Sequence, residues 1–126
     1  MILGIGHDAV AIARFAHWHT YSHKKLQRIF SEHEIRYCVQ TPLKSAERFA
    51  ARFAAKEALY KALCQIGTGT TRPFLTLCAQ SELVPSPQGP QIKTTYPLQG
   101  TISVSITHTD TYAYAIVVIH LPPKLA

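Results

Sequence analysis

The sequence predicts an α+β protein in which an antiparallel sheet packs around one long central helix, with short helices before it. Three observations carry this prediction. Strong helix formers fill residues 48–63, apolar and alternating segments typical of strands lie near both ends, and short amphipathic stretches precede the central run. At 126 residues, of which 47% are hydrophobic, the chain is expected to form a single domain, residues 1–126.

The first expected element is a strand over residues 2–12. Its apolar residues are interrupted by Gly4 and Gly6, which allow a strand to bend or another segment to approach it closely. Asp8 lies in or just after this strand. Its carboxylate either faces water or serves as a ligand, and the strand pattern leaves both readings open.

Residues 14–30 are expected to form one broken helix or two short ones. The segment is cationic, and aromatic and aliphatic residues separate its four basic residues: Arg14, Lys24, Lys25 and Arg28. Such a segment is either a solvated helix face or a surface for an acidic partner. Three histidines also lie here, but their spacing points them in different directions and no carboxylate or thiol is near, so a metal site is not expected: His17, His19 and His23.

A short helix is expected from Ser31 through Cys38. Ser31 and Glu34 have the Ser-x-x-Glu spacing of a capping box, which gives Glu34 a structural role. Pro42 then interrupts the chain before the central helix. The three cysteines have no C-x-x-C spacing and are interpreted as reduced core residues: Cys38, Cys64 and Cys78.

The central helix over residues 48–63 is expected to be buried on two sides. Helical winding gathers its bulky side chains in one stripe and its alanines in another, so the helix should be packed on both. Glu57 and Lys61 are one turn apart on one face between the stripes. They are either a surface ion pair or charged groups in a cleft or at a metal, because burying charge is costly.

The remaining chain is expected to be mainly β. Gly67 is the expected C-terminal stop of the central helix, and the Gly67-Thr68-Gly69 loop is either a turn or a phosphate-binding loop. Four strands are expected: Phe74–Ala79, Gln91–Thr95, Ile102–Ile106 and Tyr112–His120. The last two should form a hairpin with Tyr112–His120 central. His108 lies at the hairpin tip, where it is either simply exposed or functional.

Charge favours an acidic partner. Thirteen Lys and Arg against seven Asp and Glu give a net charge of +6, which suits nucleic acid, an anionic cofactor or an acidic protein. There is no apolar run long enough to cross a bilayer, and the first residues are not typical of a signal or transit peptide. A cytosolic location without membrane association is expected.

Three segments together resemble the acyl-carrier-protein synthase family, the small 4′-phosphopantetheinyl transferases. They are Gly4-Ile5-Gly6-His7-Asp8, Arg52-Phe53-Ala54-Ala55-Lys56-Glu57-Ala58-Leu59-Tyr60-Lys61-Ala62 and Val104-Ser105-Ile106-Thr107-His108. The resemblance covers nearly the whole chain and implies the 4′-phosphopantetheinyl transferase-like fold. It also implies Mg²⁺-dependent transfer of the phosphopantetheine arm of coenzyme A to a serine of apo-acyl carrier protein, with release of adenosine 3′,5′-bisphosphate. The implied assembly is a homotrimer with active sites between subunits.

The resemblance also implies roles for individual residues. Asp8 and Glu57 match the metal ligands, and Lys61 matches a catalytic lysine that binds phosphate and stabilises the leaving bisphosphate. The serine proton is taken either by Glu57 or by a metal-bound water. Further residues match coenzyme A contacts: Arg52, Lys61, Gly67, Thr68, Gly69 and His108. The cationic helix that docks the carrier protein is matched by the four basic residues Arg14, Lys24, Lys25 and Arg28.

Two departures from the family pattern are visible. Residues 94–100 are too short and too rich in Pro and Gly for the helix that usually precedes the penultimate strand, which affects trimer packing and the pocket wall. His7 replaces a residue that is usually non-ionisable. The sequence leaves two alternatives to the transferase: a basic nucleic-acid-binding domain, for which no motif is present, and a non-catalytic relative that only binds coenzyme A or carrier protein.

Overall fold

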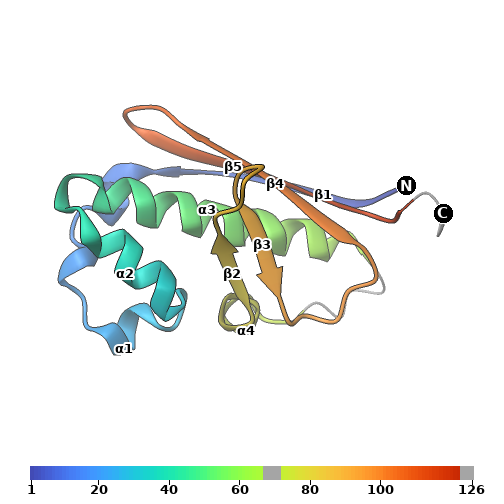
Figure 1. Cartoon of the computed structure of the whole chain (residues 1–126), viewed down its shortest axis with the longest axis horizontal. Coiled ribbons are helices and arrows are strands. Elements are labelled where there is room, and N and C mark those ends of the chain that lie inside the picture. The colour runs from blue at the N-terminus through green and yellow to red at the C-terminus, as the bar shows by residue number, and fades with distance from the viewer. Residues whose placement is uncertain (67–71, 123–126) are drawn as a thin grey trace.

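Helix α3 (Ser45–Cys64) runs along one face of a three-stranded antiparallel sheet (Figure 1). The sheet has β5 (Tyr112–His120) at its centre, between β1 (Ile2–Ala11) and β4 (Thr101–His108). The computed structural model describes residues 1–66 and 72–122. The α+β class, the long helix, the C-terminal hairpin and the central position of its last strand are as predicted.

Strand β1 lies directly against α3 because both elements present small residues at their contact. A Cβ atom on Gly6 would collide with the carbonyl oxygen of Ala58 and lie 2.7 Å from the backbone nitrogen of Ala62. A Cβ atom on Gly4 would likewise collide with the Ala62 carbonyl oxygen. This confirms the expected close approach. Since alternate residues of a strand share a face, Asp8 points to the same side as Gly6, toward α3.

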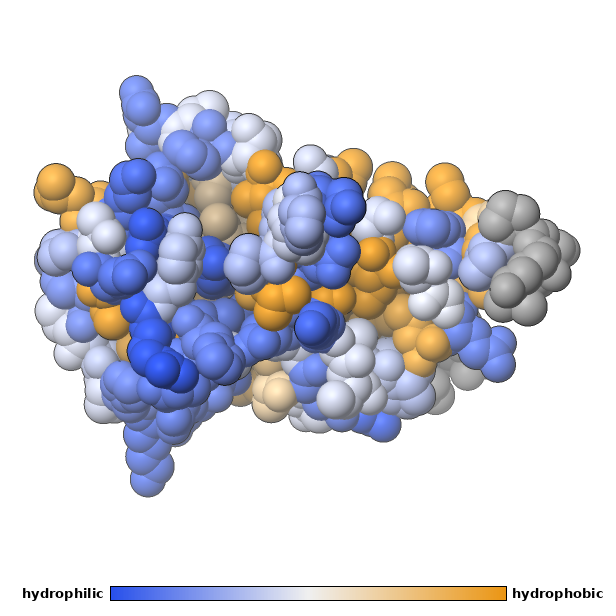
Figure 2. Space-filling model, in the orientation of Figure 1, coloured by the Kyte–Doolittle hydropathy of each residue, from blue (hydrophilic) through white to orange (hydrophobic). Residues whose placement is uncertain are grey.

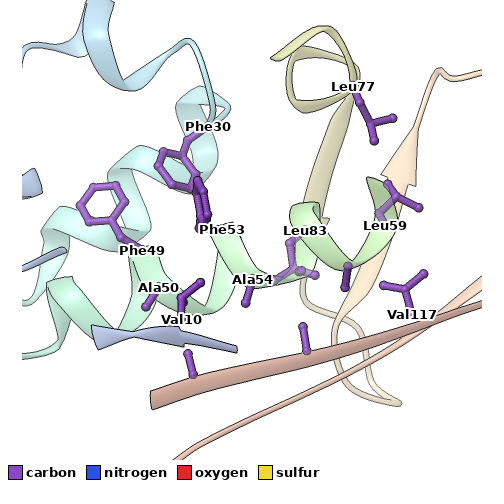
Figure 3. Close-up of a cluster of buried hydrophobic side chains, with 14 of the residues drawn as sticks. Val10, Phe30, Phe49, Ala50, Phe53, Ala54, Leu59, Leu77, Leu83 and Val117 are labelled. Carbon is purple, nitrogen blue, oxygen red and sulfur yellow. The ribbon is translucent and has the colours of Figure 1, made fainter. Parts of the chain in front are cut away.

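The opposite stripe of α3 packs against the N-terminal helical segment. This segment comprises η1 (Ile12–Phe15), η2 (Trp18–Thr20), α1 (His23–Leu26), α2 (Glu32–Gln40) and η3 (Pro42–Lys44). The Trp18 ring lies 6.2 Å from that of Phe49 and 6.3 Å from that of Phe53, between ring centroids. Figure 3 shows Phe30, Phe49 and Phe53 gathered at this contact, which confirms a helix buried on two sides.

Helix α2 begins with the predicted capping box. The Ser31 hydroxyl accepts a hydrogen bond from the Glu34 amide at 3.2 Å, and the Glu34 carboxylate accepts one from the Ser31 amide at 2.8 Å. The segment before it is more broken than expected, because residues 12–30 form two 3₁₀ turns and a single α turn.

The prediction of a strand at Phe74–Ala79 is wrong, because these residues form helix α4. Short apolar runs fit either period, and here Leu77 and Cys78 are buried whereas Leu75 and Thr76 are exposed, which is a helical pattern. The strand lies just beyond, as β2 (Ser81–Val84), and pairs with β3 (Gln91–Thr94) in a separate two-stranded sheet (Figure 1).

All three cysteines are free, but only two are core residues. Cys38 and Cys78 are buried, and burial raises the pKa of each thiol to about 12. Cys64 is exposed at the last turn of α3, so its assignment to the core was wrong. The predicted helix stop at Gly67 lies outside the described residues.

The connection from β3 to β4 contains no helix over residues 95–100, as its composition indicated. Within the described part of the chain, no helix has the length and apolar character needed to span a membrane.

Candidate active site

Asp8 of β1 and Lys61 of α3 form an ion pair across the contact between the two elements. Lys61 Nζ donates to Asp8 Oδ1 at 2.9 Å and to the backbone carbonyl of His7 at 3.1 Å. The Asp8 side chain is 14% exposed and that of Lys61 is 52% exposed. The ion pair of Lys61 therefore joins the helix to the first strand, in place of the surface pair with Glu57 that helical spacing allowed.

Glu57 lies beside this ion pair. The pKa of Glu57 is raised above its usual value, first by burial and then by the negative charge of Asp8, while Lys61 and Arg14 act in the opposite direction. The two carboxylates are thus close enough to repel each other. Asp8 Oδ2 is buried and has no hydrogen-bond partner among the residues that the structure describes. A buried, unpaired carboxylate oxygen next to a second carboxylate is an environment that favours a bound cation.

The donors present fit a hard divalent cation. Asp8 and Glu57 supply carboxylate oxygens, and the described residues contain no cluster of three or more His, Cys, Asp or Glu side chains. Zinc sites usually need three or four such ligands. Mg²⁺ by contrast is commonly held by one or two carboxylates, with phosphate oxygens and water completing its shell.

Arg52 faces a different side of α3. Five residues separate it from Glu57, which corresponds to about 140° around the helix. It lines a cavity of about 680 Å³ between α2, α3 and β2, which we call the Arg52 pocket; its walls also include Tyr37, Leu83 and Pro90. The buried Arg52 Nε has no hydrogen-bond partner within residues 1–66 and 72–122. The guanidinium groups of Arg48 and Arg52 lie 3.9 and 4.4 Å from the centre of the Tyr37 ring. Arg52 therefore gives the pocket one basic side chain, stacked on Tyr37, while the carboxylates of Glu34 and Glu82 also line it.

His108 lies toward the start of α3. Its Nδ1 is 3.2 Å from Glu47 Oε1, in the first turn of the helix. Glu57 follows ten residues later, about 15 Å along the helix axis. Within one chain, His108 is therefore not brought to the Asp8, Glu57 and Lys61 cluster.

The four basic residues of the cationic segment are divided between two places. The Arg14 guanidinium packs 4.8 Å from the Phe53 ring centre and is close enough to lower the pKa of Glu57. Lys24, Lys25 and Arg28 are exposed around α1. Figure 2 shows mostly hydrophilic residues over the end of the molecule where Figure 1 places α1 and α2. Gly67, Thr68 and Gly69 lie outside the described residues.

A family model for the 4′-phosphopantetheinyl transferase superfamily matches residues 4–117. The chain belongs to this superfamily. It is 34% identical over 134 residues to the holo-[acyl-carrier-protein] synthase of Treponema denticola, a match covering 94% of this chain and 98% of that one. A match to the synthase of Koribacter versatilis is 51% identical over 70 residues and covers 55% of this chain and 53% of that one.

Solved synthases share the fold of this transferase. A holo-(acyl-carrier-protein) synthase from Bacillus anthracis, in complex with coenzyme A (3′,5′-ADP), superposes with a TM-score of 0.76 at 31% identity. The match covers 97% of this chain and 99% of that chain. The family expected from the three sequence motifs and the fold class are confirmed.

Sequence reasoning missed one buried charged residue of the transferase, Lys56. Its Nζ lies 2.7 Å from Glu34 Oε1, and both side chains are almost fully buried. The sequence does indicate that Lys56 is buried, because helical spacing places it in the same stripe as Phe53 and Tyr60. A lysine in a buried stripe requires a partner. The structural role assigned to Glu34 is correct, although its contacts extend beyond the capping box.

Proposed function

We propose that this chain is a holo-acyl-carrier-protein synthase, which transfers the 4′-phosphopantetheine arm of coenzyme A to a serine of apo-acyl carrier protein. Membership of the superfamily and the similarity to named synthases support this activity. The observation that carries the proposal is the convergence of Asp8 and Glu57 beside Lys61. The same family match favours the transferase over a basic nucleic-acid-binding domain.

The metal in this proposal is Mg²⁺, held by Asp8 and Glu57. The unpaired, buried Oδ2 of Asp8 supports this assignment, because it needs a partner that no side chain in the described part of the chain supplies. When bound, Mg²⁺ would supply charge neutralisation for the pyrophosphate of coenzyme A.

The reaction exchanges one phosphorus–oxygen bond for another. The serine hydroxyl oxygen bonds to the phosphorus that carries pantetheine, and the bond from that phosphorus to the bridging oxygen breaks, releasing adenosine 3′,5′-bisphosphate. The raised pKa of Glu57 makes its carboxylate a stronger base, which suits it to accept the serine proton. Lys61 is half-exposed next to Asp8, where its ammonium group can stabilise the leaving bisphosphate or give it a proton.

The nucleotide end of coenzyme A is assigned to the Arg52 pocket. The size of the pocket and the Arg52 guanidinium group in its wall suit an anionic ligand, and the two carboxylates in the wall are already bonded, Glu34 to Lys56 and Glu82 to Ser31. The pocket and the acid pair lie on different sides of α3, and His108 lies near the start of the helix. We therefore propose that a complete site takes these groups from two neighbouring copies.

The assembly proposed is a homotrimer formed through the uncovered face of the three-stranded sheet. The large apolar residues exposed on this face include Ile5, Tyr112, Tyr114 and Ile116. Asp8, which points toward α3, is the one Asp, Glu, Lys or Arg residue in β1, β4 and β5. Each copy has a net charge of +6, but this face carries no Lys or Arg. Copies can therefore meet on it without repulsion between like charges at the contact.

The carrier protein is assigned to the cationic segment. Arg14 lies next to Glu57, and Lys24, Lys25 and Arg28 extend the positive charge away from the acid pair across α1. Complementary charge on an acidic carrier protein would steer the encounter and set its orientation, with the target serine toward the acid pair.

Mass spectrometry of apo-acyl carrier protein after incubation with coenzyme A, Mg²⁺ and the chain tests the proposed reaction. The expected result is a mass increase of one phosphopantetheine arm and appearance of adenosine 3′,5′-bisphosphate. An unmodified carrier protein together with salt-sensitive, sequence-tolerant binding of RNA or DNA would contradict the proposal and favour the nucleic-acid alternative.

A further inference from the structure

A buried ion pair joins α2 to α3 on the side of the helix that carries the Arg52 pocket. Glu34 Oε1 and Lys56 Nζ are 2.7 Å apart, and their side chains are 1% and 3% exposed. Glu34 is also one of the residues that line the pocket. Neither residue belongs to the acid pair or to the cationic segment, so the proposed chemistry leaves both unexplained.

The Glu34 carboxylate connects three separate elements. Its Oε1 accepts from Lys56 of α3 and, at 2.8 Å, from the Ser31 amide at the start of α2. Its Oε2 accepts from the Leu83 amide of β2 at 3.0 Å. Lys56 in turn donates to the carbonyl of Ile29 at 2.6 Å and to that of Cys78 at 3.4 Å. The pair is therefore bonded to the chain on both sides of the pocket.

Strand β2 needs such an anchor. It has four residues and pairs with β3 alone, in a sheet of two strands. Isolated two-stranded hairpins are only marginally stable. Yet Glu82, Leu83 and Val84 of β2 form a wall of the Arg52 pocket, and Ser31 Oγ donates a further bond to the Glu82 carboxylate. The Glu34 carboxylate is the group that ties the Leu83 backbone of this wall to the helix bearing Arg52.

We propose that the Glu34–Lys56 pair is a positioning device for the nucleotide end of coenzyme A. It holds the β2 wall at a fixed separation from Arg52. This inference rests on the proposed function. Glu34 and Lys56 touch no reacting atom, and they act through Leu83 and Arg52.

A positioning role and a merely structural role make different predictions for paired substitutions. Replacing both members of a buried ion pair with apolar residues of similar size often leaves stability unchanged. Glu34→Met/Lys56→Met removes the acceptor for the Leu83 amide. Glu34→Gln/Lys56→Met also removes both charges but keeps an oxygen that can accept from Leu83, so it is the matched control.

The test is calorimetric titration of the full chain with adenosine 3′,5′-bisphosphate, without divalent metal, at a temperature where both variants are folded. We expect Glu34→Met/Lys56→Met to bind about tenfold more weakly than Glu34→Gln/Lys56→Met, because one lost backbone anchor displaces the wall. In steady-state transfer, KM for coenzyme A should rise in the first variant while kcat changes little, as expected for lost ground-state binding.

Equal affinities in the two double variants, with a wild-type chain that binds the bisphosphate, would overturn the positioning role and leave the proposed function intact. A wild-type chain that neither binds the bisphosphate nor transfers would overturn the proposed function and this inference with it. If Glu34→Met/Lys56→Met does not fold, the single variant Glu34→Asp provides the test. It keeps a negative charge facing Lys56, but its shorter side chain draws the carboxylate away from the Leu83 amide. Weaker bisphosphate binding in Glu34→Asp supports the inference, and wild-type affinity overturns it.

Discussion

Asp8 accepts a hydrogen bond of 2.9 Å from Lys61 although 53 residues separate the two in sequence. The bond crosses the contact at which Gly6 meets Ala58. The packing of β1 on α3 therefore also places Asp8 next to Glu57. Any change that moves β1 away from the helix moves Asp8 away from Glu57. Stability and the proposed activity are therefore linked at this contact.

Glu57→Gln should abolish transfer while raising the melting temperature of the metal-free chain at pH 7. Burial and Asp8 raise the pKa of Glu57 in the folded state, so the folded state holds its proton to a higher pH than the unfolded state. Stability therefore falls as pH rises from the unfolded pKa through the folded one, so ionised Glu57 costs more stability at pH 7 than at pH 4. Thermal melts should show a larger gain from Glu57→Gln at pH 7 than at pH 4.

The control for this prediction is Glu32→Gln, which changes an exposed carboxylate on α2 that pairs with His23 and Arg36. It should leave transfer unchanged. Transfer at the wild-type rate by Glu57→Gln would remove Glu57 from the proposed mechanism.

Gly6→Ala should destabilise the fold and lower activity together. The added methyl group would collide with the Ala58 carbonyl, and overpacking of this kind costs about 1–3 kcal/mol. Gly100→Ala is a graded comparison, because its Cβ would meet its nearest neighbour, the His120 carbonyl oxygen, at 3.1 Å. Urea denaturation should rank Gly6→Ala as the more damaging change. Equal midpoints would contradict the close packing of β1 on α3.

Arg52→Gln should raise KM for coenzyme A by about tenfold or more while leaving kcat within a few-fold of wild type. The variant loses a charge-assisted contact that binds the substrate equally in the ground state and in the transition state. Arg36→Gln is the matched control: Arg36 is exposed on α2 and pairs with Glu32 at 3.9 Å. A selective fall in kcat, with KM unchanged, would assign Arg52 to a different role from the one proposed.

Ile116→Asp should dissociate the proposed trimer. The side chain is 42% exposed on the outer face of β5, so a single chain should tolerate the charge, whereas three copies meeting on this face would bury it. Light scattering coupled to size-exclusion chromatography should give a trimer mass for wild type and a monomer mass for the variant. A monomeric wild type that retains full transfer would contradict both the trimer and the shared site.

Sequence periodicity predicted the elements that carry strong patterns and failed where patterns are short. The capping box of Ser31 and Glu34, the 20-residue helix and the C-terminal hairpin follow from local chemistry. The six residues of α4 are too few to separate a helical period from a strand period, so the following strand was missed as well.

The acid pair could be anticipated only in part from the sequence. Gly6 and the alanines of α3 indicated a close contact, but spacing alone left Asp8 on either face of its strand. The resemblance to the family motif identified Asp8 as a metal ligand. Helical spacing could indicate that Lys56 is buried, but the identity of its partner and the Arg52 pocket depend on how α2 and β2 meet α3, which neither local propensity nor spacing contains.

The most direct test of the account compares the intact mass of apo-acyl carrier protein after incubation with wild type and with Asp8→Asn, across a series of Mg²⁺ concentrations. We expect saturable, chelator-sensitive transfer by wild type and none by a folded Asp8→Asn chain at any Mg²⁺ concentration. Wild-type transfer by Asp8→Asn would contradict the claim that Asp8 and Glu57 jointly hold the metal.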